Sequence, residues 1–556
     1  MLKFLLHCKS TFALGVVVLT LWSFPGFAQD GNPSPPPGPS AANQQVPPAI
    51  QKELDALAAR IEQLEAELKN TKAKEQPASA KAEVPAPATE EASLIPSAPA
   101  PAAPPTQPAD PDPLSEPVDP GAKAAAFAQS QAMTGKHSIP FAFADFSWLN
   151  GNSREKDSPL DSKVFTGEFR ADTSYIDDFA HPIDHTLVGS SESGRTNEVQ
   201  VQQLGIGGDF HYDNVRGRLL TQFGLYSTET PRNDATPGRG QWDLSDAYRY
   251  LAEAYGGYHF DVLHGVNVDA GIFMSYIGLF SYYNYDNWVY QPSYVSSNTP
   301  WFFNGARIQI FPTEKLKIEP WLINGWQAYG TANGRPGLGL QVLWRPSGRL
   351  EVLGNQYGVG RDTIGAPFRT RYHTDDSIEY KYYDDPAAFF DKSAFSVTLD
   401  AGCESGSGVS CFYQSRSVPK QYFLGLMVYN RLWFDRDRYG LTLGGGAIDN
   451  PGRYLVLLPP INGATAFSGT PYFTENPGDP YKAWDASATF DYMPSQFITF
   501  RWEYDHRAAN VPYFAGTGGV TPPGGNTGPP GSIVPGFTPD LRKAENRLNL
   551  AVLVKL

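Results

Sequence analysis

Residues 498–505 read Ile-Thr-Phe-Arg-Trp-Glu-Tyr-Asp, so apolar and polar side chains alternate without a break. In an extended strand, successive side chains point to opposite faces. One face of this segment would carry only apolar groups, most of them aromatic, and the other would carry the charges. The same period of two runs through 165–175 and 548–556. This pattern is typical of a transmembrane β-strand with lipid on one side and water on the other.

Sixteen such segments can be traced from residue 164 to the C-terminus. The predicted strands are 164–177, 199–212, 214–226, 248–260, 265–276, 302–311, 315–326, 336–345, 349–358, 370–383, 394–401, 420–433, 438–448, 483–492, 497–507 and 546–556. Short connections such as Met493–Gln496 and Asp435–Asp437 alternate with long ones such as 449–482 and 508–545. Short periplasmic turns and long external loops characterise outer-membrane barrels. We therefore expect an all-β fold, a transmembrane antiparallel up-and-down β-barrel of about 16 strands.

The composition agrees with a barrel. Of 556 residues, 41% are hydrophobic, 13% aromatic and only 18% charged, and the mean hydropathy is −0.35. Because barrels alternate apolar and polar residues, they do not look hydrophobic on average. A soluble β-sandwich also alternates, but it would not usually need strands this long with so many aromatic residues on one face. The formal net charge of −14 makes nucleic acid a poor partner, and we expect none.

The N-terminus has the features of a secretory signal. Lys3 and Lys9 form a basic start, residues 12–24 are mostly apolar, and Gly26–Ala28 offers small residues for cleavage. We therefore predict a signal peptide at 1–28 and a place in the outer membrane of a Gram-negative bacterium. The alternative is an uncleaved anchor, although the apolar run is short for one.

Between the signal peptide and the barrel, a segment with a heptad pattern separates two predicted linkers. Residues 29–49 are predicted as a Pro-rich linker, 71–140 as a disordered Pro/Ala-rich linker, and 141–556 as the barrel. Within 50–70, the apolar residues follow the a/d spacing of a coiled coil: Ile50, Leu54, Leu57, Ile61, Leu64 and Leu68. Arg60 and Glu65 occupy g and e positions, which favours a parallel homotrimer. The alternative is an isolated amphipathic helix, since fewer than three heptads are marginal.

Three cysteines are present. Cys8 would leave with the signal peptide, so Cys403 and Cys411 would remain in an oxidising compartment. Such a pair indicates a local disulfide in an external loop. Two cysteines are too few for a standard four-ligand zinc site, and we expect no metal.

Several stretches are similar to a known family. They are Ala252–Tyr255, Asn298–Ala306, Asp449–Tyr454, Arg501–Arg507 and Pro512–Gly516. Over about residues 164–556, the chain resembles the β-barrel porin family described as OmpL-like. The resemblance implies a barrel and a pore for small hydrophilic solutes, and it leaves the solute open.

A pore needs a polar lumen and a constriction, and it needs no cofactor and no catalytic group. The strand phase nominates pore-lining residues of both signs: Glu168, Arg170, Asp172, Arg216, Arg218, Arg249, Glu253, Lys317, Glu319, Arg501, Glu503, Asp505 and Arg507. Each of them has an alternative role as a paired wall charge that does not affect selectivity. Near 501–507 the charges nearly cancel, so we expect solute size to matter more than charge there.

The third long external connection, about 277–301, is a candidate constriction loop. It is rich in aromatic residues that could offer ring faces to sugars: Tyr282, Tyr283, Tyr285, Trp288, Tyr290 and Tyr294. In familiar porins of this strand number the third loop folds inward, and the likeness in architecture implies the same here. The alternative is that these rings form an interfacial belt or pack inside the loop.

Two other function classes stay open. The coiled coil could bind peptidoglycan or a periplasmic partner, with the barrel as a structural anchor in outer-membrane lipid. An outer-membrane lipid hydrolase would need a serine near His506, and no nucleophile motif supports one. We therefore expect a passive porin that is not an enzyme.

Overall fold

The computed structural model describes residues 138–556, except 237–239, 332, 361–365, 367 and 413–417. The predicted signal peptide, the coiled coil and all but the last few residues of the linkers lie outside the described residues, and those predictions are not tested. By its contacts the chain divides into two units, Met1–Asp110 and Pro111–Leu556, and everything below concerns the second.

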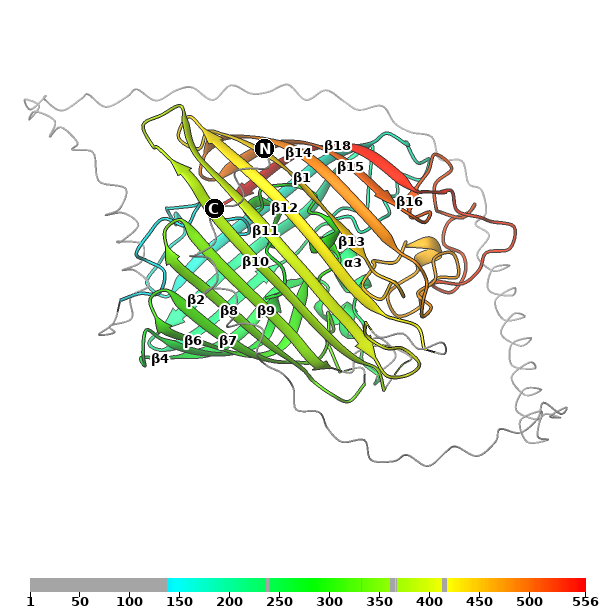
Figure 1. Ribbon diagram of the computed structural model, residues 1–556, viewed down its shortest axis with the longest axis horizontal. Coiled ribbons are helices and arrows are strands. Elements are labelled where there is room, and N and C mark those ends of the chain that lie inside the picture. Colours follow the sequence, from blue (N-terminus) through cyan, green and yellow to red (C-terminus); the bar gives the residue numbers. More distant parts are fainter. Residues whose placement is uncertain (1–137, 237–239, 332, 361–365, 367, 413–417) are drawn as a thin grey trace, which may run out of the picture. The chain divides into compact units, whose positions relative to one another are not determined.

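Sixteen antiparallel strands form a closed barrel, which confirms the predicted fold class and strand number (Figure 1). The wall strands are β1 (Phe165–Asp178), β2 (Val199–Tyr212), β3 (Val215–Thr221), β4 (Leu251–Phe260), β5 (Val266–Met274), β6 (Phe302–Thr313), β7 (Leu316–Ile323), β8 (Gly337–Ser347), β9 (Leu350–Gly360), β10 (Thr370–Asp384), β11 (Phe390–Ser405), β12 (Tyr422–Phe434), β13 (Tyr439–Asp449), β14 (Lys482–Ser495), β15 (Ile498–Ala509) and β18 (Ala544–Lys555). Each wall strand pairs with the next wall strand along the chain, β15 with β18 included, and β16 (Phe514–Ala515) and β17 (Leu541–Arg542) form a separate pair outside the wall.

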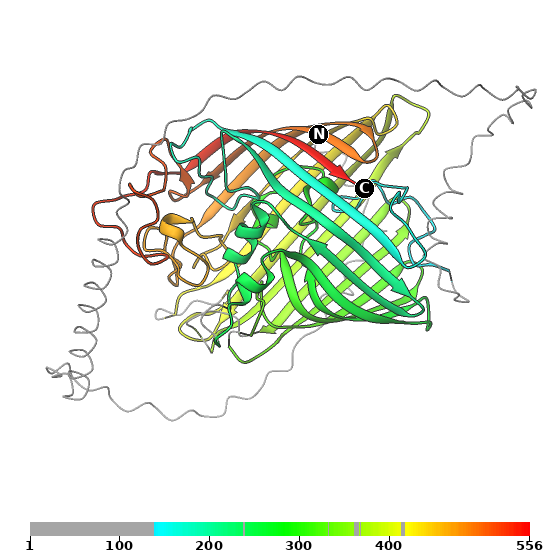
Figure 2. The ribbon, with the colours of Figure 1, turned by 180° about the vertical axis from the view of Figure 1, so that it is seen from behind.

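The first and last wall strands close the barrel. β1 pairs with β18 in the register Thr173↔Val552 and with β2 in the register Gly167↔Gly208. Figure 2 shows the cyan β1 beside the red β18. Closure leaves no wall strand with an unpaired edge, which is the condition for a sheet to lie in lipid.

The alternation of residues 498–505 separates the two faces of the wall as expected. Trp502 and Tyr504 are each 43% exposed on the outside, whereas Arg501, Glu503 and Asp505 are almost completely buried on the inside. The apolar surface faces outward and the charges face inward, which is the reverse of a soluble protein.

Turns of a few residues at one end alternate with long connections at the other. We number the long connections L1 (179–198), L2 (222–250), L3 (275–301), L4 (324–336), L5 (361–369), L6 (406–421), L7 (450–481) and L8 (510–543). They contain short helices: α3 (Tyr226–Arg232) and α4 (Leu244–Tyr248) in L2, η1 (Asn284–Asp286) and α5 (Tyr294–Ser297) in L3, and η2 (Ile461–Gly463) in L7. By the usual orientation of such barrels, the long connections are external and the turns periplasmic.

Two strands end earlier than predicted. β3 ends at Thr221 and β7 at Ile323, where the sequence pattern suggested 226 and 326. After β3, Gly224 has φ +92°, and a Cβ there would lie 2.6 Å from the carbonyl oxygen of Val201. The backbone therefore leaves the wall at a position that only glycine fits well.

The apolar core lies inside the barrel. It combines inward-facing aromatic residues of the wall with side chains of L3 and of residues 146–149, including Trp148, Trp288, Tyr294 and Phe303. Among the described residues, no helix is both long and apolar enough to cross a membrane.

Candidate functional site

The predicted lumen residues are mostly buried inside the barrel. Arg170, Asp172, Glu253, Glu319, Arg501, Glu503, Asp505 and Arg507 are buried, and Glu168, Arg216, Arg218 and Lys317 are partly buried. Arg249 lies in L2 just before β4 and pairs with Asp246 of α4 at 3.3 Å. The inward-facing charges are therefore packed in contacts, and do not stand in open water.

On β1 to β4, these charges form one network. The guanidinium of Arg218 contacts Glu168 at 2.7 Å, Asp209 at 2.8 Å and Glu253 at 2.9 Å. Arg170 pairs with Glu168 as well and reaches Asp286 of L3 at 2.9 Å. Because each buried charge has a partner of opposite sign, the desolvation cost of burying it is offset.

Around β5 to β7, a second group pairs in the same way. Asp269 accepts contacts from Arg307 at 3.1 Å and from Arg216 at 3.3 Å. Lys317 contacts Glu319 at 2.8 Å. The inward-facing charges of the described wall thus pair with one another, as in the alternative role considered from the sequence.

L3 lies inside the barrel and is fixed there by the wall. The Arg501 guanidinium donates to the carbonyl oxygens of Asn284, Asn287 and Val289 at 3.1, 2.6 and 2.8 Å. It also pairs with Asp491 at 2.7 Å. Arg501 thus holds three backbone carbonyl groups of the loop against β14 and β15.

Two wall carboxylates hold the next part of L3. Glu503 accepts hydrogen bonds from the backbone N–H groups of Tyr290 at 2.5 Å and Gln291 at 2.7 Å. Asp485 accepts from the Ser293 hydroxyl at 2.7 Å and the Tyr294 N–H at 3.0 Å. Hydrogen bonds to a charged acceptor are stronger than neutral ones, so the path of this loop is specified by the wall.

The aromatic side chains of L3 pack against the wall and against one another. Tyr283 donates to Glu253 at 2.9 Å, Tyr290 donates to Asp172 at 3.1 Å, and the Arg507 guanidinium lies 4.3 Å from the ring centroid of Tyr294. The hydroxyl of Tyr285 donates to the carbonyl oxygen of Gln496, the Tyr282 ring packs at a tilt on the Tyr226 ring, and the Trp288 ring contacts Trp433 edge-on. Most of these rings are buried, so in this conformation they do not present faces to a sugar.

Residues 138–156 cross the periplasmic end of the barrel, a feature that the sequence did not predict. Phe141 N–H donates to the carbonyl oxygen of Glu314 at 2.7 Å. Further along the chain, Trp148 Nε1 donates to the carbonyl oxygen of Gly348 at 3.1 Å. These acceptors lie at two different periplasmic turns. We call this stretch the N-terminal segment.

The N-terminal segment continues to the opposite side and contacts L3. Arg154 donates to the carbonyl oxygen of Ile498 at 2.8 Å, beyond the β14–β15 turn. The Trp288 indole N–H donates to the carbonyl oxygen of Trp148 at 3.2 Å, and Trp288 N–H donates to Asn150 Oδ1 at 2.8 Å. The only sequence signal for this docking is the aromatic run Phe141, Phe143, Phe146 and Trp148, which has no strand or helix period.

One cavity lies on each side of L3, the first towards the other long connections and the second towards the N-terminal segment. The external one has a volume of about 330 Å³ and is lined by residues of L2 to L7, among them Trp326, Arg369, Arg371, Tyr454 and Glu475. The inner one, of about 30 Å³, lies between L3 and the N-terminal segment, beside Arg154, Asp286, Arg431 and Arg501. We call these two spaces the external cavity and the inner cavity.

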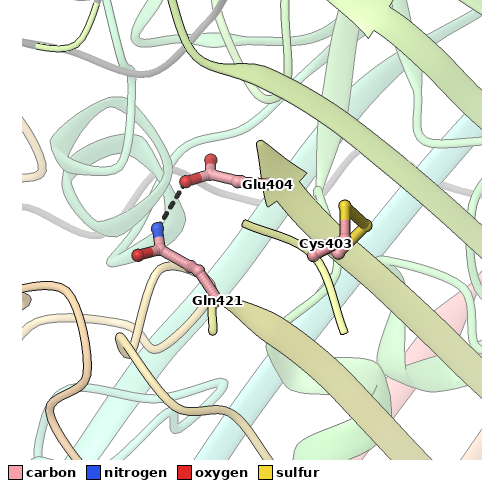
Figure 3. The surroundings of a disulfide bond; sticks show 4 residues. Cys403, Glu404 and Gln421 are labelled. Carbon is pink, nitrogen blue, oxygen red and sulfur yellow. Dashed lines mark hydrogen bonds between the residues drawn. A yellow bond between two sulfur atoms is a disulfide. The ribbon is translucent and has the colours of Figure 1, made fainter. Parts of the chain in front are cut away.

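The predicted disulfide between Cys403 and Cys411 is present, at the external end of β11 (Figure 3). The next residue, Glu404, points into the barrel. It pairs with Arg371 at 2.8 Å and Arg369 at 3.3 Å, and it accepts from Gln421 Nε2. The disulfide therefore fixes the backbone next to the carboxylate that neutralises the arginines of the external cavity.

Two carboxyl groups at the junction of L1, L2 and L3 have raised pKa values. Burial is the main reason that the pKa of Glu192 rises to about 7 and that of Glu229 to about 8. Glu229 also feels the charge of Glu192, and accepts one hydrogen bond, from the N–H of Gly194. Arg232 and Arg507 oppose the two shifts only in part.

His506, the residue considered for a hydrolase, faces outward. Its Nδ1 lies 2.8 Å from Asn546 Oδ1, and its ring packs on Trp484. In the described part of the chain, no group of His, Cys, Asp and Glu side chains is arranged to hold a metal ion.

The family model described as "Putative beta-barrel porin-2, OmpL-like" matches residues 170–527. The chain belongs to this family. The resemblance seen in the sequence is thereby confirmed, and the protein is an outer-membrane β-barrel of a Gram-negative bacterium. Among curated protein sequences, none matches this chain.

Solved structures similar to this one include several outer-membrane channels. The channel DcaP of Acinetobacter baumannii is 13% identical, with a TM-score of 0.37, and the match covers 71% of this chain and 96% of that one. An anion-selective porin from Comamonas acidovorans is 9% identical, with a TM-score of 0.38, over 70% and 99%. OprB of Pseudomonas putida is 10% identical, with a TM-score of 0.39, over 70% and 94%.

Proposed function

We propose that this protein is a porin through which small hydrophilic solutes diffuse passively. One observation carries the proposal: L3 is folded into a closed barrel and held there by Arg501, Glu503 and Asp485. A segment fixed across a lumen narrows it and sets which solutes fit. Membership of a porin family supports the same function.

The proposed path runs along the barrel axis through the two cavities. A solute would enter the external cavity, pass L3, and leave beside the N-terminal segment. Between the cavities, side chains of L3 pack against the wall, so passage requires them to change rotamer. We therefore propose L3 as the main constriction and the N-terminal segment as a second one.

Charged side chains along this path pair with charges of opposite sign. At the external cavity, Arg369 and Arg371 face Glu404, and deeper in, Arg501 faces Asp491. We propose that solute size limits passage more than solute charge does, and that the protein needs no cofactor, no metal and no catalytic residue. In the narrow parts of the path, polar groups of the wall would replace part of the hydration shell of the solute.

We further propose that the protein is a homotrimer. The support is the heptad pattern of 50–70, with Arg60 and Glu65 at positions that pair between parallel helices. The same helix could attach the barrel to peptidoglycan or to a periplasmic partner. Such an attachment is compatible with a pore.

Liposome swelling tests the proposed function directly. Purified protein in liposomes should admit small sugars, amino acids and anions, and the rate should fall with solute size more steeply than it changes with charge. Liposomes with heat-unfolded protein are the control. If folded protein leaves liposomes impermeable to every solute, the porin proposal is wrong. Loss of envelope attachment without loss of solute uptake, on deleting 29–137, would identify the tether as a separate role.

A further inference from the structure

A polar cluster interrupts the apolar outer face of the barrel. Gln356 on β9 donates through Nε2 to the Thr374 hydroxyl of β10 at 2.5 Å, and that hydroxyl donates to Asp376 Oδ2 at 2.9 Å. Gln356 and Asp376 are exposed on the outside of the wall, and Thr374 is half-buried. We call these three residues the outer polar cluster.

The outer polar cluster lies near mid-height of the wall. Asp376 pairs in register with Gly354 of β9 and Leu399 of β11, both several residues from either end of their strands. In Figure 1, β8 to β11 lie side by side across this wall. The apolar band of such a barrel is about 25 Å tall and centred on mid-height, so the cluster lies at the level of the lipid tails.

A carboxylate at this depth is an exception in this barrel. Other outward-facing charged residues of the described wall strands, such as Asp177, Asp449 and Lys482, lie at strand ends, where water and lipid headgroups reach them. Lipid tails offer Asp376 no hydrogen-bond donor, and ionisable groups at membrane depth are usually covered by protein. A polar partner at the middle of the bilayer would therefore stabilise the outer polar cluster.

The surface around the cluster allows close approach of another wall. A Cβ built on Gly354 would lie 3.3 Å from Asp376 Oδ1, so glycine keeps that side of the carboxylate open. Gly358 lies two positions beyond Gln356 on the same strand. The rim consists of exposed apolar side chains that could seal the contact from lipid: Leu338, Leu340, Ile378 and Leu399. A polar centre with an apolar rim suits a protein contact within a membrane.

We propose that the outer face of β8 to β11, centred on the outer polar cluster, is where copies of this chain meet in the membrane. The cluster is self-complementary, because Gln356 supplies N–H donors and Asp376 supplies acceptors. A patch near a symmetry axis meets its own copies. The heptad pattern of 50–70 favours a parallel homotrimer, which would bring copies of the chain together. This inference rests on the proposed oligomer but not on the proposed transport.

Cysteine cross-linking in native outer membranes tests which face makes the contact. The variant Gln356→Cys adds a thiol at the cluster, while Cys403 and Cys411 stay bonded to each other. The matched control is Ala488→Cys, which is exposed at mid-height on β14, five strands around the wall from β9. A short bis-thiol reagent should give several-fold more covalent dimer of this chain for Gln356→Cys than for Ala488→Cys.

Equal or weaker cross-linking at 356, or a product containing another protein, would overturn the proposal. A second test uses Gln356→Leu/Asp376→Leu, with Asn546→Leu as control, because Asn546 is a polar residue on the outer side of β18, away from this face, and pairs with Tyr504 at 2.8 Å. The double variant should lower the temperature at which the oligomer dissociates in detergent, and the control should not. An unchanged dissociation temperature, or a wild-type monomer, would contradict the proposal. Swelling assays on the same samples would show separately whether the pore is intact.

Discussion

L3 and the N-terminal segment both occupy the barrel, but they are held in different ways. L3 is tied by buried charges of the wall, with Arg501, Glu503 and Asp485 each binding its backbone. The N-terminal segment relies more on aromatic packing and on hydrogen bonds to carbonyl groups at the rim, such as that from Trp148 to Gly348. Its charged contacts to the wall are fewer: Asn150 N–H donates to Glu379 at 3.0 Å, and Glu155 pairs with Lys555 at 3.3 Å. Charged anchors inside a low-dielectric interior are costly to break, whereas rim contacts compete with water. We infer that L3 is a permanent part of the barrel and that the N-terminal segment can detach.

The largest effect should come from breaking an L3 anchor. Arg501→Glu removes three contacts to L3 carbonyl groups and places a carboxylate beside Asp491. Removing one partner of a buried ion pair costs about 3–5 kcal/mol, so L3 should leave its position and the conductance in planar bilayers should rise.

Arg438→Glu is the charge-matched control, because Arg438 is half-exposed at the β12–β13 turn and pairs only with Asp435 among the residues described. Arg501→Lys should keep part of the wild-type conductance. If Arg501→Glu channels, correctly folded, conduct like wild type, L3 is not held as described.

A smaller effect is expected at the N-terminal segment. Trp148→Ala removes its buried indole and the hydrogen bond to Gly348, which should cost about 3 kcal/mol of docking free energy. The segment should then become sensitive to added protease near residues 138–156, with a modest rise in conductance. Trp242→Ala is the control, since Trp242 is 86% exposed in L2. Protection equal to that of wild type would show that the segment does not depend on Trp148.

The disulfide between Cys403 and Cys411 lies away from both L3 and the N-terminal segment. Replacing Cys403 and Cys411 with serine opens a closed loop of sequence separation 8, which should lower the unfolding free energy by about 2.5 kcal/mol. Thermal unfolding of the purified barrel measures this loss. Conductance should change little, because neither cysteine contacts L3 or the N-terminal segment in the described structure. A large change in conductance with an unchanged unfolding free energy would show that the disulfide acts on the pore and not on stability.

The smallest effect should be a pH dependence of the loops that cover L3. Burial raises the pKa of Glu229 from the ordinary value of 4.5 to about 8, so its protonated form is favoured in the folded loops. The resulting stability is fully present below about pH 4.5 and is lost as pH rises through about 8. Hydrogen exchange in L1 and L2, corrected for the intrinsic exchange rate at each pH, should therefore speed up between about pH 4.5 and pH 8.

Glu229→Gln should flatten this pH profile. Glu198→Gln is the control, because Glu198 is partly exposed in L1 and its pKa is lowered by a hydrogen bond from Arg195. A profile that stays the same in Glu229→Gln would assign the pH dependence to another group.

The strand pattern was predictable because its cause is local. Lipid outside and polar groups inside impose a period of two, and residues 498–505 display it without interruption. Connection lengths then gave the strand order. The early end of β3 could not be read from hydropathy, because it depends on how Gly224 passes Val201 in the neighbouring strand.

The site was only partly predictable. Aromatic enrichment pointed to L3, and strand phase pointed to inward charges such as Arg501 and Glu503. Neither signal tells that the charges bind the L3 backbone, because such contacts join residues more than two hundred positions apart. The N-terminal segment has no period, and its docking depends on acceptors at several turns, so only its aromatic run hinted at it.

Single-channel conductance of a barrel with a shortened L3 tests the central claim most directly. Residues 283–291 of L3 would be replaced by a short Gly-Ser linker, and 523–531 of the exposed L8 would be replaced identically as the control. We predict a several-fold higher conductance and a larger size limit in liposome swelling for the L3 variant, with wild-type values for the L8 variant. A correctly folded L3 variant with wild-type conductance and size limit would contradict the account.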